Sequence, residues 1–155
     1  MVDPATGKSD IDHFADFMRL LAPPPSLPLT RSASAGKMIF SQLGCAVCHT
    51  PVLFTGASPI RALNSRPVPL YSDLLLHDMG SLGDNIGQAS ARLREMRTAP
   101  LWGVRAISTY LHDGRANSLG EAIRAHDGEA AIARGRYLRL SFIQRQNLFD
   151  FLNSL

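Results

Sequence analysis

The stretch Gly44–Thr50, GCAVCHT, holds both cysteines of the chain, three positions apart, and a histidine directly after the second. Cys-x-x-Cys-His is the attachment sequence of haem c, in which two thiols bond to the porphyrin and the adjacent imidazole becomes an axial iron ligand. The other interpretations are a thioredoxin-like dithiol, which needs a βαβ context, and half of a zinc site, which needs two more closely spaced ligands. Neither context occurs, so we expect Cys45 and Cys48 to carry one covalent haem c, with His49 as its proximal ligand.

The composition limits the class of protein. The chain has 155 residues, 45% of them hydrophobic and 19% charged, which suits one domain with a modest core. Since no apolar run approaches about 18 residues, we expect no membrane span. The net charge of +3 comes from 16 Lys and Arg against 13 Asp and Glu, with the arginines scattered among acidic residues. A nucleic-acid surface needs clustered basic residues, so we do not expect nucleic acid as a partner.

Apolar spacing predicts an all-α domain with long irregular loops around one haem. Residues 118–121, SLGE, form a capping-box sequence, and His126 stands at the end of the helix that they begin. Residues 50–88 are rich in Pro and Gly and predict a long wrapping loop without a convincing strand pattern. Helices are expected within residues 9–22, 29–44, 118–125, 129–137 and 141–155.

Other stretches extend the evidence to nearly the whole chain. In order they are GCAVCHTP at 44–51, YSDLLLHDMG at 71–80, RTAPLWGV at 97–104, YLHDGRANSLGEAIRAH at 110–126 and FLNSL at 151–155. In content and order they resemble the di-haem cytochrome c peroxidases and, more closely, their relatives, the di-haem or thiol oxidoreductases. In such proteins two cytochrome c domains follow one another, each with its own haem. The resemblance therefore implies a cytochrome c fold and a redox function.

Two similar helices bear on the domain organisation. ADFMRLL at 15–21 and FDFLNSL at 149–155 share an Asp-Phe pair and the same apolar spacing. In the family that the chain resembles, the first domain ends in such a helix. The resemblance thus implies that residues 1–29 are the helix and linker left from a preceding cytochrome domain, and that residues 30–155 are the haem domain. Chance similarity between two amphipathic helices is the alternative for so short a match.

The sixth iron position separates electron transfer from catalysis, because two protein ligands close the iron to substrate and one leaves it open. His126 follows His112 by fourteen residues, where the peroxidases that the chain resembles place an axial Met, so the resemblance implies His126 as the second ligand. A His at a helix C-terminus can instead interact with the helix dipole. Met79 is the alternative ligand, since cytochromes c commonly use Met. Lesser candidates are His13, Met18, His77 and Met96.

Four further positions complete the expected site. Arg97 and Arg115 are candidates to pair with the haem propionates, although a solvated surface role is the alternative for each. Trp102 is expected to pack in the core or against haem, or to carry electrons between domains. The resemblance implies that His112 hydrogen-bonds to hold its turn. Peroxidases of this type hold calcium with Thr-Ala-Pro before that turn, and the sequence Ile-Ser-Thr at residues 107–109 argues against calcium here.

These observations predict a haem c electron-transfer domain, the C-terminal half of a di-haem oxidoreductase, whose six-coordinate iron relays electrons to a first-domain haem. The alternatives are a catalytic, peroxidase-type domain with an open iron and, where haem is absent, a thiol or zinc site. The isolated domain is expected to be an electron carrier rather than an efficient enzyme. Expected partners are the preceding haem domain and a redox protein. Haem attachment outside the cytoplasm implies a bacterial periplasmic location, although residues 1–10 contain no export signal.

Overall fold

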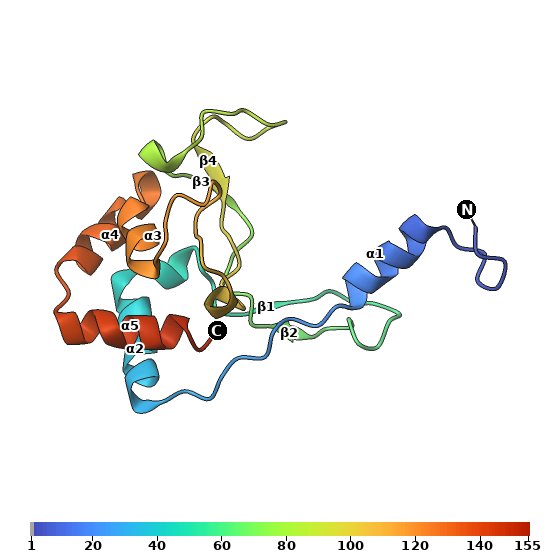
Figure 1. The fold of residues 1–155 in the computed structure, drawn as a ribbon, viewed down its shortest axis with the longest axis horizontal. Coiled ribbons are helices and arrows are strands. Elements are labelled where there is room, and N and C mark those ends of the chain that lie inside the picture. Colours follow the sequence, from blue (N-terminus) through green and yellow to red (C-terminus); the bar gives the residue numbers. More distant parts are fainter. Residues whose placement is uncertain (1) are drawn as a thin grey trace.

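Two crossing helices, α2 (Arg31–Leu43) and α5 (Phe142–Leu152), form the framework of the core (Figure 1). The structure is a computed structural model that describes residues 2–155. The helices approach closely because Gly36 has no side chain: a Cβ there would lie 1.8 Å from the backbone oxygen of Asn147. These are the two helices that contribute most to the core, and the apolar spacing of both segments predicted them.

Aromatic side chains fill the space around this crossing. Phe40 of α2 meets Phe151 of α5 edge to face, with ring centroids 5.4 Å apart. Tyr71, from the loop after the cysteine motif, packs against both rings at 5.8–6.1 Å. Such edge-to-face pairs are a favoured arrangement of buried aromatic rings. The other buried apolar members of this cluster are Ala33, Ile39, Leu43, Val104, Tyr137, Leu148, Leu152 and Leu155.

Helices predominate, as expected, but the fold is not plainly all-α, because the long loops contain short strands that the sequence did not predict. Two short antiparallel pairs close the long loops on themselves, and these ladders satisfy backbone groups that a wrapping loop would otherwise leave unpaired. Each strand has only two or three residues, too few to produce an alternating apolar pattern. The strands are β1 (Leu53–Phe54) with β2 (Pro67–Val68), and β3 (Leu76–Asp78) with β4 (Glu95–Arg97).

The remaining helices follow the predicted order with small shifts. Ser118 caps α3 by accepting a hydrogen bond from the Glu121 N–H, but the Glu121 carboxylate accepts from the N–H of Asn117 rather than of Ser118, so the capping box is not reciprocal. The helix expected at 129–137 is preceded by a turn of 3₁₀ helix, Gly128–Ala130. The α-helices are α1 (Asp10–Leu20), α3 (Leu119–Ala125) and α4 (Ala131–Leu138); the other 3₁₀ turns are Cys45–Val47, Gly80–Leu82 and Val104–Ala106.

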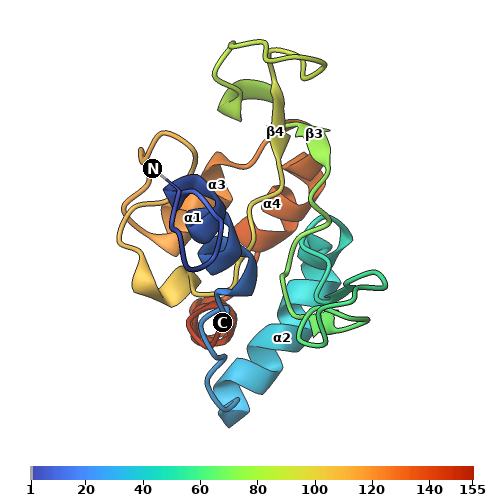
Figure 2. The same cartoon turned by 90° about the vertical axis from the view of Figure 1, so that its right-hand side faces the viewer.

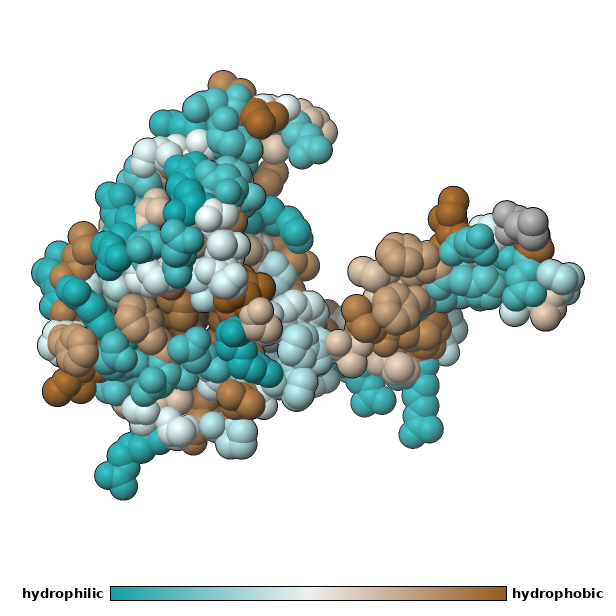
Figure 3. Space-filling view, viewed as in Figure 1, coloured by the Kyte–Doolittle hydropathy of each residue, from teal (hydrophilic) through white to brown (hydrophobic). Residues whose placement is uncertain are grey.

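Helix α1 projects away from the body of the molecule, as Figures 1 and 2 show from two directions. It is amphipathic, as expected, yet none of its residues is buried. Figure 3 shows its apolar surface facing outward near the linker. Within residues 2–155, none of the helices combines the length and apolar character required to cross a membrane. The apolar side chains exposed on and just after α1 are Ile11, Phe14, Phe17, Met18, Leu20 and Leu21.

The linker after α1 lies against the C-terminal end of the chain. The N–H of Leu27 donates to the backbone oxygen of Ser154 over 2.7 Å. The Arg105 guanidinium donates to the backbone oxygen of Pro25 over 2.7 Å and also to that of Leu155. One arginine thus bridges the linker and the residues that follow α5.

Candidate functional site

The cysteine motif begins where α2 ends, as its sequence predicts. Gly44 terminates the helix in the left-handed conformation, with φ of 95°, which glycine adopts without steric cost. The next three residues form the turn Cys45–Val47. Arg136 from α4 donates to the backbone oxygen of Leu43 over 3.1 Å and so ties the end of α2 to α4. Both thiols are free and partly buried on this short turn.

A backbone hydrogen bond holds the imidazole of His49. Its Nδ1 lies 3.0 Å from the carbonyl oxygen of Tyr71. Because a carbonyl only accepts, Nδ1 carries the proton and donates. Burial lowers the pKa of His49 to about 4, although interactions with the backbone of Tyr71 and of Ala99 oppose this shift. The ring is therefore neutral at neutral pH, and its Nε2 keeps a lone pair that can bind a metal.

His126 has the same arrangement on a different element. It is the C-terminal cap of α3, and its Nδ1 donates to the carbonyl oxygen of Ala122 over 2.8 Å. Burial lowers its pKa as well, so this imidazole is also neutral with a free Nε2. Its ring centroid is 6.4 Å from that of His49, and the two ring planes are inclined by 48°. Two neutral imidazoles from different parts of the chain are thus brought together.

This pair fits the requirements of a metal held between two imidazoles. An imidazole nitrogen binds a metal at about 2.0–2.1 Å, which puts two such nitrogens about 4 Å apart and their ring centres roughly 2 Å further apart. The observed 6.4 Å agrees with that sum. Donation of the other ring nitrogen to a carbonyl is also the usual outer contact of a metal-bound histidine. Together with two free thiols three positions apart, these donors suit an axially ligated, thioether-bound haem.

Both free thiols are protonated at neutral pH, because their pKa values are raised. Burial raises the pKa of Cys45 to about 11. Burial also raises the pKa of Cys48, and the nearby carboxylates of Asp73 and Glu129 add to that rise. The Cys48 sulfur lies 3.8 Å from Nδ1 of His77. The side chains of Cys48, Asp73 and His77 each place one potential metal-binding atom within 4.8 Å of the others.

The other ligand candidates lie in different surroundings. Met79 is partly buried at the start of the turn Gly80–Leu82, where its N–H donates to the backbone oxygen of Arg94. His13 is on the projecting α1, where its ring contacts Thr6 at 3.0 Å. Met96 stands opposite His77 in the β3–β4 ladder. Met18 is exposed on α1.

The arginines predicted to meet haem propionates point to the surface. Arg97 is exposed on β4, and Arg115 is exposed and forms an ion pair with Asp113. Trp102 is partly buried, next to core-packing residues in the chain. The expectation that a hydrogen bond from His112 holds its turn is wrong, because its nearest charged partner, Asp84, is 4.0 Å away. The turn is held instead by backbone bonds between Tyr110 and Ala116.

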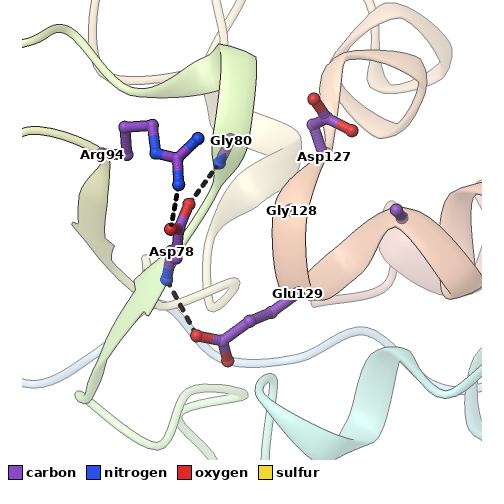
Figure 4. Close-up of a pocket in the computed structure, with 7 residues that line it drawn as sticks. Asp78, Gly80, Arg94, Asp127, Gly128 and Glu129 are labelled. Atoms are coloured by element: carbon purple, nitrogen blue, oxygen red, sulfur yellow. Dashed lines mark hydrogen bonds and ion pairs between the residues drawn. The ribbon is translucent and has the colours of Figure 1, made fainter.

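Sequence reasoning missed a junction that Figure 4 shows beside the segment after His126. Asp78 of β3 lies between Arg94, 2.8 Å away, and Glu129, which accepts from the Asp78 N–H over 2.9 Å. An open surface pocket of about 550 Å³ is lined by residues of the hairpin and of the turn Gly128–Ala130. These contacts join residues far apart in the chain through ordinary Asp, Glu and Arg side chains, so no local motif signals them. The lining residues are Asp78, Gly80, Arg94, Asp127, Gly128, Glu129 and Ala131.

Comparison with known proteins identifies the family of the chain. Residues 2–155 match the family described as "Di-haem oxidoreductase, putative peroxidase". No curated protein matches the chain. The fold is similar to a chain of Kuenenia stuttgartiensis hydrazine synthase, with a TM-score of 0.66 and 22% identity, covering 96% of this chain and 56% of that one. The family match assigns a haem-related redox role, and the chain belongs to the di-haem oxidoreductase family.

Proposed function

We propose that this chain is a haem c electron-transfer domain whose iron is bound by His49 and His126. The observation that carries the proposal is the pair of neutral imidazoles, 6.4 Å apart, each with its Nδ1 committed to a backbone carbonyl. Cys45 and Cys48 are the proposed thioether anchors. Family membership supports haem as the cofactor, and the Cys-x-x-Cys-His sequence supports covalent attachment of one haem.

The residues of the chain would bind and orient the cofactor without supplying acid or base catalysis. A bound haem contributes a one-electron iron couple. The carbonyls of Tyr71 and Ala122 fix the rotation and the tautomer of the two imidazoles. With a histidine on each face, the iron would be closed to substrates, which favours electron relay over peroxide chemistry. A histidine in place of an axial Met also removes the ligand that raises the potential in cytochromes c.

The second haem implied by the family name would have to come from elsewhere. Two cysteines can anchor one covalent haem, and the chain spans only 56% of the hydrazine synthase chain that it resembles. We therefore assign residues 1–29 to the end of a preceding cytochrome domain and residues 30–155 to the haem domain. The exposed apolar face of α1 supports this division, because such a face is normally covered. Electrons would pass from a redox partner in the periplasm, through this haem, to the first-domain haem.

A zinc site is the second candidate function, and one observation favours it. Cys48, Asp73 and His77 offer sulfur, oxygen and nitrogen atoms within 4.8 Å of one another. This is a set that Zn²⁺ accepts in proteins. Haem attachment would consume the Cys48 thiol, so the zinc site and the haem site exclude each other.

The mass of the mature protein tests the proposal. The chain is produced in a host that exports it and attaches haem, and is then denatured and weighed, with a pyridine haemochrome spectrum recorded in parallel. One covalently bound haem per chain is expected, and none in a Cys45→Ser, Cys48→Ser double variant. A bare chain mass, with one equivalent of zinc under native conditions that is lost in Cys48→Ser but kept in Cys45→Ser, would establish the zinc alternative instead.

A further inference from the structure

The side chain of His77 is held between two carboxylates. Its Nε2 lies 2.9 Å from Asp73 Oδ2, and its Nδ1 lies 2.8 Å from Glu129 Oε2. A neutral imidazole has only one N–H, whereas a carboxylate only accepts, so two such bonds require the imidazolium form. The His77 and Asp73 side chains are only 16% and 14% exposed, so their ion pair is largely shielded from water. Hydrogen bonds between charged groups in such a setting are the strong ones.

Asp73, one of the two carboxylates that contact His77, is hydrogen-bonded to the cysteine motif. The N–H of Asp73 donates to the backbone oxygen of Cys48 over 2.8 Å. The same loop includes Tyr71, whose carbonyl accepts the Nδ1 proton of His49. Asp73 is therefore fixed to the segment that presents the proposed proximal ligand.

Glu129, the other carboxylate that contacts His77, lies in the segment that follows His126. Glu129 is three residues further along the chain, and its second oxygen accepts from the N–H of Asp78. The two segments also touch directly: a Cβ at Gly128 would lie 2.2 Å from the backbone oxygen of Asp78. Asp127 accepts hydrogen bonds from the backbone and hydroxyl of Ser81, at 3.1 and 2.7 Å. Glu129 and its neighbours thus anchor the segment after His126 to the β3 hairpin (Figure 4).

We propose that His77 is a positioning residue for the iron: its link from Asp73 to Glu129 keeps His126 opposite His49. The inference rests on the proposed haem function. Removal of the imidazolium would leave Asp73 and Glu129 without their shared cation, and two negative charges would then face each other across the junction. The segment after His126 would separate from the loop, and the His126–iron bond would open more often. The Asp127–Ser81 contacts would remain and limit the effect.

The test compares haem-loaded variants by the spin state of the ferric iron and by the rate of cyanide binding, which requires an open iron position. His77→Ala should show a high-spin fraction that the wild type lacks and should bind cyanide about tenfold faster, the factor that corresponds to one hydrogen bond to a charged group. Glu129→Gln keeps an acceptor for the Asp78 N–H, removes one charge at an exposed position, and should show a smaller change in the same direction. His13→Gln, on the projecting α1, is the matched histidine control and should behave as the wild type.

A stability control separates positioning from general loosening. Ile39→Val removes one methylene from the buried core and should lower the melting temperature without changing the spin state. A wild type that is itself high-spin would refute the proposed ligand pair. A low-spin wild type, with His77→Ala and Glu129→Gln unchanged in spin state and cyanide rate, would overturn only the role of His77. An equal high-spin fraction in Ile39→Val would also overturn it.

Discussion

The rings of His49 and His126 lie 6.4 Å apart, although one follows the cysteine motif at the end of α2 and the other ends α3. Both donate from Nδ1 to a backbone carbonyl. Both are partly buried, and this burial lowers their pKa, so they are neutral at neutral pH. The fold thus places two neutral imidazole rings next to each other. The proposed coordination of the iron depends on this relationship.

The close crossing of α2 and α5 makes Gly36 indispensable. In Gly36→Ala the new Cβ would lie 1.8 Å from the backbone oxygen of Asn147, and backbone cannot yield as a flexible side chain does. We expect a loss of about 3 kcal/mol or more in the free energy of unfolding. Gly135→Ala is the matched control, because Gly135 is in α4 with nothing within 4 Å of the added Cβ. That variant should gain about 0.5–1 kcal/mol in urea unfolding.

We expect Arg105 to protect the linker from proteolytic cleavage. Its guanidinium holds the backbone oxygens of Pro25 and Leu155, while every residue from 22 to 30 is exposed. Arg105→Ala should therefore be cleaved within 22–30 several times faster than the wild type by a protease of broad specificity, with the sites read by mass spectrometry. Arg61→Ala, in an exposed loop, should match the wild type. Equal cleavage of all three proteins would show that the bridge does not restrain the linker.

The ion pairs of His77 predict a specific pH dependence. The hydrogen bond to Glu129 is the main reason that the pKa of His77 is raised above its ordinary 6.5. At a pH between 6.5 and the raised pKa of the folded state, His77 is protonated in the native protein but not in the unfolded chain. The free energy of unfolding therefore falls as pH rises. The contribution is complete below 6.5 and disappears above the raised pKa of the folded state.

Urea unfolding at several pH values measures this effect. His77→Gln should remove the fall in stability with rising pH, whereas the wild type and His13→Gln should keep it. The flanking carboxylates of Asp73 and Glu129 have lowered pKa values and stay ionised throughout this range. A wild type whose stability rises from pH 6.5 to 8 relative to His77→Gln would contradict the imidazolium.

The sequence predicted those features that depend on local pattern. The apolar spacing within 29–44 and 141–155 gave the two central helices, and the caps at Thr30 and Ser141 begin them with side-chain bonds to backbone N–H groups. The position of His126 at a helix end is also confirmed, and its bond to Ala122 follows from the four-residue spacing along a helix.

Features that depend on tertiary contact could not be predicted in this way. The strand pairs are too short to carry a period, and the partners of His77 come from segments that no sequence spacing relates. Arg97 and Arg115 were chosen by residue type and position in the chain. Both side chains are exposed, so their pairing with haem propionates stays a prediction.

The ferric absorption spectrum of the haem-loaded protein, recorded for the wild type, His126→Ala and Met79→Ala, tests the central claim most directly. The wild type should be low-spin with bis-imidazole features and without the near-infrared sulfur-to-iron band of Met ligation. His126→Ala should become high-spin, while Met79→Ala should match the wild type, because the ring beside His49 is that of His126. A high-spin Met79→Ala together with an unchanged, low-spin His126→Ala would contradict the ligand pair on which the account depends.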